Sequence, residues 1–289
     1  MEPVEAAGGQ ATSLELAPEP GAAPFSVGGA LSDAWRAWSR NFWPLTGTLM
    51  LLRLPSMVLY LAWVPVRDER GVRPLLELVL RVASALVAAT ALAVGGLDAL
   101  GGRRPSIGSL LRQGIASSGR LFAASVRAFP WGTGAALIWW VTYYAMGSRG
   151  SLSRGVMGAV SFGWLAATGV LLINLPISWV RVFPLPALLI EEPERTTGEL
   201  VQRARELTLG RRWRVLPLFL TGVLVSSVET ALEYPVSASP LPSHQVAHTL
   251  VSLFSVVVDV FVEILPAVAY FHLRGGQEAK VAELSQVFE

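Results

Sequence analysis

The chain contains no cysteine, which excludes disulfides, thiolate metal sites and a cysteine nucleophile. Charge is also scarce, since 15% of the 289 residues are charged and Lys280 is the one lysine among 23 basic residues. Apolar side chains are in excess: they make up 52% of the chain, and the mean hydropathy is +0.50. One soluble core could not bury so many of them beneath a polar surface. The composition therefore predicts a membrane protein.

The first 25 residues differ from the rest of the chain. They are rich in alanine, glycine and proline, and they carry glutamates but no basic stretch followed by an apolar run. This composition predicts a disordered acidic tail over 1–25 and not a signal peptide.

Six later stretches are long enough to cross about 30 Å of hydrocarbon, which takes roughly 20 helical residues each. They lie near 42–65, 76–99, 121–146, 157–183, 214–234 and 247–272. Prolines inside them, such as Pro55, Pro130 and Pro266, are expected to kink the helices and not to end them. The predicted fold is an all-α polytopic membrane protein with six transmembrane helices.

The placement of basic residues predicts the orientation. With six spans, one side of the membrane receives Arg36, Arg40, Arg103, Arg104, Arg112, Arg120, Arg195, Arg203, Arg205, Arg211, Arg212, Arg214, Arg274 and Lys280. The other side receives only Arg67, Arg70, Arg73, Arg149 and Arg154. By the positive-inside rule, we expect a multi-pass protein of the cell (inner) membrane with both termini in the cytoplasm. The same rule accounts for the basic loops without nucleic acid, which we do not expect as a partner.

A threefold internal repeat appears when the segments that lead into the first, third and fifth spans are aligned. They are SVGGALSDAWRAWSRNFWPL from Ser26, SIGSLLRQGIASSGRLFAAS from Ser106 and TTGELVQRARELTLGRRWRVL from Thr196. Each begins with Ser or Thr, has glycine two places on, and continues through basic residues into a span. The expected organisation is three repeats, 26–105, 106–195 and 196–273, each an amphipathic surface helix plus a transmembrane hairpin, with a cytoplasmic tail over 274–289.

The leading segments have the pattern of helices that lie in the membrane surface. In the first, apolar residues recur at helical spacing opposite a polar face, and in the third Thr196 and Glu199 have capping-box spacing. Tryptophan beside arginine suits the headgroup boundary. The candidate lipid contacts are Trp35, Arg36, Trp38, Arg40, Arg211, Arg212 and Trp213. An equally weighted alternative is that these helices pack on the spans as cytoplasmic collars.

The run "RVFPLPALLIEEPERTTGELVQRARELTLGRRWRVLPLF", which starts at Arg181, resembles a signature of a group of prokaryotic multi-pass proteins. That group includes the membrane domain attached to glycerophosphoryl diester phosphodiesterases. The positions that match are Arg181, Pro186, Glu191, Arg203, Gly210, Arg211 and Trp213. The chain departs at Ala204, where the group more often has serine. The resemblance implies a membrane fold and identifies no activity.

The sequence offers little for catalysis. No segment between spans has room for a metal-dependent phosphodiesterase domain, and no Walker loop, dinucleotide fingerprint or nucleophile elbow is present. His244 and His248 have the spacing of ligands on one helix face, but a third ligand would have to come from a distant segment. We therefore expect no enzyme activity, no cofactor and no metal.

Charged residues inside the expected spans form a candidate intramembrane network. Its members are Arg53, Arg81, Arg127, Arg181, Glu229, Asp259 and Glu263. Asp259 and Glu263 lie on one polar stripe of the last span, which also contains Ser255. Arg53 and Asp259 fall near the same depth and could pair, while Glu263 lies nearer Arg127 and Arg181. We expect Asp259 and Glu263 to face the bundle interior, with Arg53 or Arg181 within salt-bridge reach. The alternative is that the arginines snorkel and the acids are protonated.

Two functional hypotheses follow. The first is a membrane scaffold or lipid-associated factor, whose partners are membrane lipids together with another membrane protein or a second copy of the chain. The second is a small permease whose charged residues line a path, because charges inside a membrane are costly and often functional. A threefold repeat of hairpins is not the inverted pair common in transporters, which favours the first hypothesis.

Overall fold

The computed structural model describes residues 25–63, 72–130, 178–238 and 243–288, and every regular element in these ranges is a helix. The all-α class predicted from the sequence is confirmed for this part of the chain. Most of the two expected spans at 121–146 and 157–183 lies outside it. In chain order the helices are α1 (Val27–Arg40), α2 (Phe42–Trp63), α3 (Val72–Leu100), α4 (Ile107–Ala128), α7 (Val180–Val182), α8 (Leu185–Glu191), α9 (Thr197–Thr208), α10 (Arg212–Ala238) and α11 (Ser243–Phe288).

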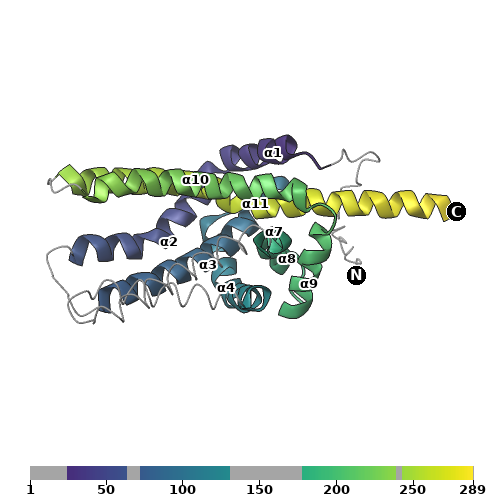
Figure 1. The fold of residues 1–289 in the computed structure, drawn as a ribbon, viewed down its shortest axis with the longest axis horizontal. Helices are drawn as coiled ribbons and strands as arrows, with labels where there is room; N and C mark the ends of the chain where they lie inside the picture. The colour runs from purple at the N-terminus through teal and green to yellow at the C-terminus, as the bar shows by residue number, and fades with distance from the viewer. Residues whose placement is uncertain (1–24, 64–71, 131–177, 239–242, 289) are drawn as a thin grey trace, which may run out of the picture.

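Helix α11 organises the molecule. It lies beside α10 along the long axis, with α2 and α3 running obliquely next to them (Figure 1). Val260 and Ile264 of α11 are buried in one core with residues of α1, α2, α3 and α4. Ala267 and Tyr270, further along α11, are buried in a second core with α8 and α9. Helix α11 therefore connects the two cores, and it continues to Phe288 without a break at the expected tail boundary.

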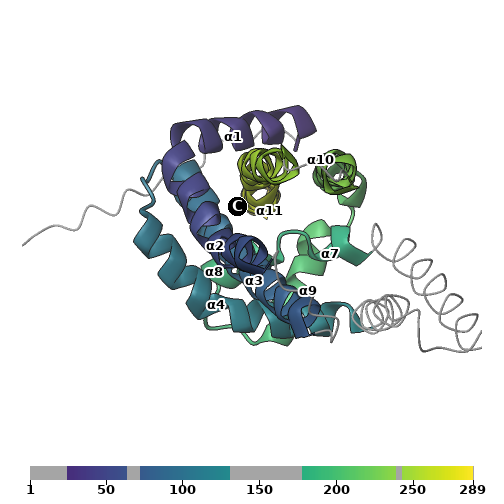
Figure 2. The same ribbon diagram turned by 90° about the vertical axis from the view of Figure 1, so that its left-hand side faces the viewer.

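Three helices run across this long axis. In Figure 2, where α10 and α11 are seen nearly end on, α1 lies across them. In Figure 1, α4 is seen nearly end on and α9 is steeply inclined, close to the same level of the bundle as α1. These are the three segments that the sequence predicts as amphipathic leaders.

Each crosswise helix begins directly after the serine or threonine that opens its aligned segment. The side chains of Ser26, Ser106 and Thr196 accept hydrogen bonds from backbone N–H groups three residues on. A side-chain oxygen at this position satisfies an N–H group that has no partner within the helix. Residues 80 and 90 positions apart therefore start helices in the same way.

The boundary expected between the second leader and its span is wrong. Helix α4 is one continuous helix to Ala128, and it ends at Phe129, whose φ is −131° and ψ is 58°. The pyrrolidine ring of Pro130 disfavours helical geometry at the preceding residue, so this proline ends the helix where we expected a kink. Pro55 and Pro266, by contrast, lie inside continuous helices, as predicted.

Two of the described helices are long and apolar enough to cross a membrane. They cover Val82–Leu100, with a mean hydropathy of 1.7, and Leu253–Gly276, with 2.0. Helices α2 and α10, which the sequence also predicts as spans, are not among them. The two apolar helices support association with a membrane.

Candidate functional site

A charged cluster joins α2 to α11. Arg53 of α2 forms an ion pair with Asp259 of α11, and its Nη1 donates to the hydroxyl of Ser255 at 3.1 Å. Asp259 is only 9% exposed, and Ser255, one turn earlier on α11, is buried. The contact that helix depth predicts between Arg53 and Asp259 is thus present, and one guanidinium joins two members of the polar stripe.

Arg127 and Arg181, two further members of the predicted network, are not assembled around this pair. Glu263 lies one turn further along α11, within electrostatic range of Arg53 and Asp259, and no ion pair joins it to Arg127 or Arg181 in the described part of the chain. Arg127 lies instead against Gly198 of α9, because α4 runs across the bundle and ends there. At Arg181 the backbone carbonyl accepts from the hydroxyl of Thr208 at 3.0 Å.

Two members of that network cannot be placed. The side chains of Arg81 and Glu229 lie outside the described residues. Of the seven charges, the structure thus groups Arg53, Asp259 and Glu263 near Ser255 and places Arg127 and Arg181 elsewhere.

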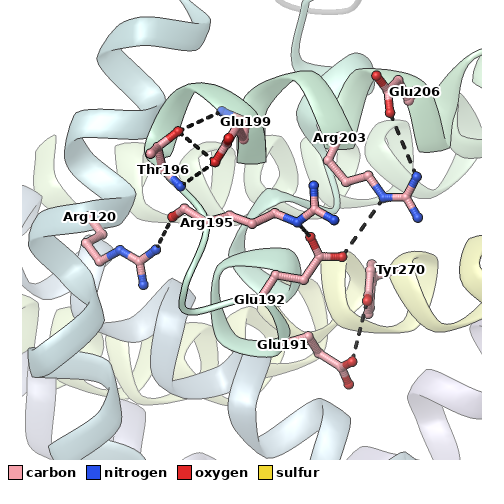
Figure 3. Close-up of polar contacts among 9 residues, drawn as sticks. All are labelled: Arg120, Glu191, Glu192, Arg195, Thr196, Glu199, Arg203, Glu206 and Tyr270. Carbon is pink, nitrogen blue, oxygen red and sulfur yellow. Dashed lines mark hydrogen bonds and ion pairs between the residues drawn. The ribbon is translucent and has the colours of Figure 1, made fainter.

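A second polar cluster lies where α8, α9 and α11 meet (Figure 3). Glu191, at the end of α8, forms an ion pair with Arg274 and accepts from the hydroxyl of Tyr270 at 3.5 Å. The next residue, Glu192, is 2.5 Å from Nε of Arg195 and 4.0 Å from Nε of Arg203. Adjacent carboxylates thus hold α11 on one side and α9 on the other.

The start of α9 completes this cluster. A carboxylate oxygen of Glu199 accepts from the backbone N–H of Thr196 at 2.8 Å and from its hydroxyl at 2.9 Å. These two bonds, in that order, and then the charge of Arg195, hold the pKa of Glu199 below its usual value. Arg120 of α4 donates to the carbonyl of Arg195 at 2.7 Å, which ties α4 to the same turn.

Sequence reasoning did not identify this cluster as a site. Glu191 entered only through the resemblance, Arg203 through the resemblance and the count of basic residues, and the sequence does not indicate Tyr270 and Arg274 as their partners. The sequence feature that could have indicated this cluster is the acidic pair Glu191 and Glu192, which lies just before an arginine-rich helix. The guanidinium and carboxylate groups face one another here, so the arrangement holds helices together and presents no activated nucleophile.

The surface of α1 is divided between a packed face and an exposed face. Ala30, Ala34 and Ala37 are buried against the bundle, since small side chains allow a close approach. Trp38 is partly buried against this core, and Trp35, whose ring centroid lies 4.7 Å from that of Trp38 with the two planes tilted by 57°, is 58% exposed. The packed face is therefore centred on alanines and not on the two tryptophans. Helix α1 packs on the bundle, as the collar interpretation expects, and also exposes a tryptophan, as the surface interpretation expects.

The charged residues of α1 differ in their contacts. Asp33 contacts Nε2 of His272 at 3.0 Å and Nη1 of Arg36 at 3.4 Å, which ties α1 to α11. Arg36 and Arg40 are themselves exposed. Their contact with lipid headgroups stays a prediction.

The residues at the corner between α9 and α10 also differ in their contacts and exposure. Arg211 donates to the carbonyls of Leu273 and Gly276 on α11, both at 3.0 Å, so it positions the corner, and its lipid contact stays a prediction. Trp213 is 84% exposed at the start of α10. Arg212 beside it is half-buried.

Among the described residues, no group of three or more His, Asp or Glu side chains could hold a metal ion. The side chains of His244 and His248 lie outside those residues. Comparisons with models of protein families, with curated proteins and with solved structures found no match. A functional assignment must therefore come from the geometry.

Proposed function

We propose that the chain is a multi-pass protein of the cell (inner) membrane that acts as a membrane scaffold or lipid-associated factor and catalyses no reaction. The proposed topology has six spans in three repeats and places both termini in the cytoplasm. The proposed partners are membrane lipids and either another membrane protein or a second copy of the chain. The resemblance to the membrane domain of glycerophosphoryl diester phosphodiesterases agrees with such a fold.

One observation carries this proposal. The amphipathic helices α1, α4 and α9 lie across the long axis close to one level, while α2, α3, α10 and most of α11 extend from that level to one side (Figure 1). Helices that lie in a membrane surface have this relation to helices that cross the membrane. The exposed tryptophans Trp35, Trp43 and Trp213 are found near this level, where aromatic side chains favour the interface.

The alternative function, a permease with a charged path, is favoured by the cluster of Arg53, Ser255 and Asp259. A polar cluster at mid-depth is costly in hydrocarbon unless it serves a structural or transport role. A guanidinium paired with a carboxylate fulfils the structural role, and this is the reason that the scaffold remains the first proposal.

A density map of the chain in lipid nanodiscs tests both functions. A closed core around Arg53 and Asp259, with ordered lipid against α1, α4 and α9, is the expected result. A continuous polar cavity that passes this pair from one face to the other would instead favour the permease. If the chain remained in the aqueous phase and did not enter the nanodiscs, both proposals would be wrong.

A further inference from the structure

One face of α10 is an unbroken row of exposed apolar side chains. Trp213, Leu220, Leu224 and Val228 are all exposed, and they follow one another at intervals of seven, four and four residues. Residues at this spacing lie on the same side of a helix. The row therefore runs from the crosswise helices toward the far end of the bundle.

Helix α2 has a matching row. Trp43, Met50, Leu54 and Val58 are exposed at the same intervals, and each lies 170 positions before its counterpart on α10. This is the sum of the two repeat offsets in the sequence. Two helices with equivalent places in the repeat thus present equivalent apolar rows.

The two rows differ in the charge of the residues beside their first tryptophan. Trp213 is flanked by Arg212 and Arg214, whereas Trp43 is flanked by Phe42 and Pro44. No ion pair to Arg212 or Arg214 is found within the described ranges. Charge next to an apolar row therefore distinguishes α10 from α2.

The corner before α10 is held rigidly in place. Gly210 has a φ of +76°, which turns the chain sharply between α9 and α10. Arg211 fixes the turn through its two hydrogen bonds to carbonyls of α11. With Arg211 fixed in this way, Arg212 and Arg214 stand on either side of Trp213 at the level of the crosswise helices.

We propose that this face of α10 binds an anionic phospholipid, with the phosphate at the start of the helix, where Arg212 and Arg214 flank Trp213, and an acyl chain along the apolar row. From Trp213 to Leu224 the helix rises roughly 16 Å, which matches half of a hydrocarbon core of about 30 Å. Arginine is well suited to a phosphate, and the row accommodates one chain in one leaflet. The inference rests on the proposed membrane location and adds a lipid class to it.

The test is native mass spectrometry of the full chain in mild detergent, titrated with phosphatidylglycerol or with phosphatidylcholine of the same acyl chains. The wild type should bind phosphatidylglycerol more tightly, and R212Q/R214Q should lose about thirtyfold of that affinity, which corresponds to about 1 kcal/mol for each arginine. R212K/R214K, which keeps both charges, should retain most of the affinity. Glycerol 1-phosphate, which has no acyl chain, should not compete at equal concentration.

The matched control is R103Q/R104Q, which removes two exposed arginines from the turn between α3 and α4, away from the row on α10. It should leave the preference for phosphatidylglycerol unchanged. The inference fails if R212Q/R214Q binds as the wild type does, if R103Q/R104Q loses as much affinity, or if glycerol 1-phosphate displaces the lipid. Each of these results can occur in a chain that is fully inserted in the membrane, so none of them contradicts the proposed function.

Discussion

At the scale of single residues, Arg53 and Asp259 illustrate what periodicity can and cannot predict. Their depth along two helices follows from counting residues, so their pairing could be predicted over a separation of 206 positions. The partners of Arg127 and Arg181 could not be predicted in this way, because these contacts depend on the direction of α4 and on the short helices α7 and α8. Helix direction is set by packing and is not encoded in a hydrophobic period.

The ion pair between Arg53 and Asp259 should behave as a structural pair. We expect Asp259→Asn and Arg53→Gln each to cost about 3 kcal/mol of unfolding free energy, because each leaves one charge buried without its partner. The double variant should lose much less than the sum of the two. The measurement is thermal or denaturant unfolding in detergent, arranged as a double-mutant cycle. Additive losses would show that the pair does not act as a unit and would favour a charged path.

Glu199 makes the start of α9 sensitive to acid. Its pKa in the folded chain lies below the ordinary 4.5, so the ionised carboxylate stabilises the cap above that pH, and this stabilisation is lost as the pH falls through the folded value. We expect the NMR shift of the Thr196 amide to titrate below pH 4.5. In Glu199→Gln the same amide should show no such titration. A transition above pH 4.5 in the wild type would contradict this assignment.

At the scale of helices, the sequence predicts starts better than ends and faces. The N-cap at Thr196 could be predicted from its spacing to Glu199, because a side-chain oxygen there accepts a hydrogen bond from a backbone N–H group of its own helix. The end of α4 at Phe129 could not be predicted, since an apolar segment alone does not show whether a helix continues or stops. The alanine face of α1 could not be predicted either, because small side chains contribute little to a hydrophobic pattern. Close helix contacts depend on such small side chains, and they become visible only in three dimensions.

Packing between α3 and α4 should depend on Gly114. A Cβ atom at this position would lie 2.8 Å from Cβ of Ala91 and 2.8 Å from the carbonyl oxygen of Val87, and Thr90 donates to the Gly114 carbonyl at 2.9 Å. We expect Gly114→Ala to cost about 1–3 kcal/mol of unfolding free energy, since α4 must move away from α3. Denaturant unfolding in detergent measures this loss.

Gly119 provides the control on the same helix. A Cβ atom there would meet nothing within 4 Å, so Gly119→Ala should gain up to about 1 kcal/mol from helix propensity alone. Equal effects of the two substitutions would show that the contact at Gly114 does not limit the approach of α4 to α3.

At the scale of the whole molecule, one level of crosswise helices separates two regions. On one side lie α2, α3, α10 and most of α11, and on the other the end of α11 projects beyond the other described helices (Figure 1). The sequence predicts the existence of the three amphipathic helices, but their common level is a property of the folded chain. That level gives the proposed topology a physical reference plane.

The absence of cysteine makes this topology directly testable, because a single introduced cysteine is the only site for a thiol reagent. A membrane-impermeant maleimide added to intact cells should label the three outer loops and leave the inner positions unlabelled until the membrane is opened. The outer sites are Asp68→Cys, Ser148→Cys and Ser239→Cys, and the inner sites are Ser32→Cys, Arg104→Cys and Glu194→Cys. Ser32, Arg104 and Glu194 are exposed, so a lack of labelling would report the membrane and not burial in the protein. The expected alternation follows from the proposed six spans, which would place fourteen basic residues on the inner side. Labelling of Arg104→Cys from outside, or protection of Ser148→Cys, would contradict the arrangement of three hairpins.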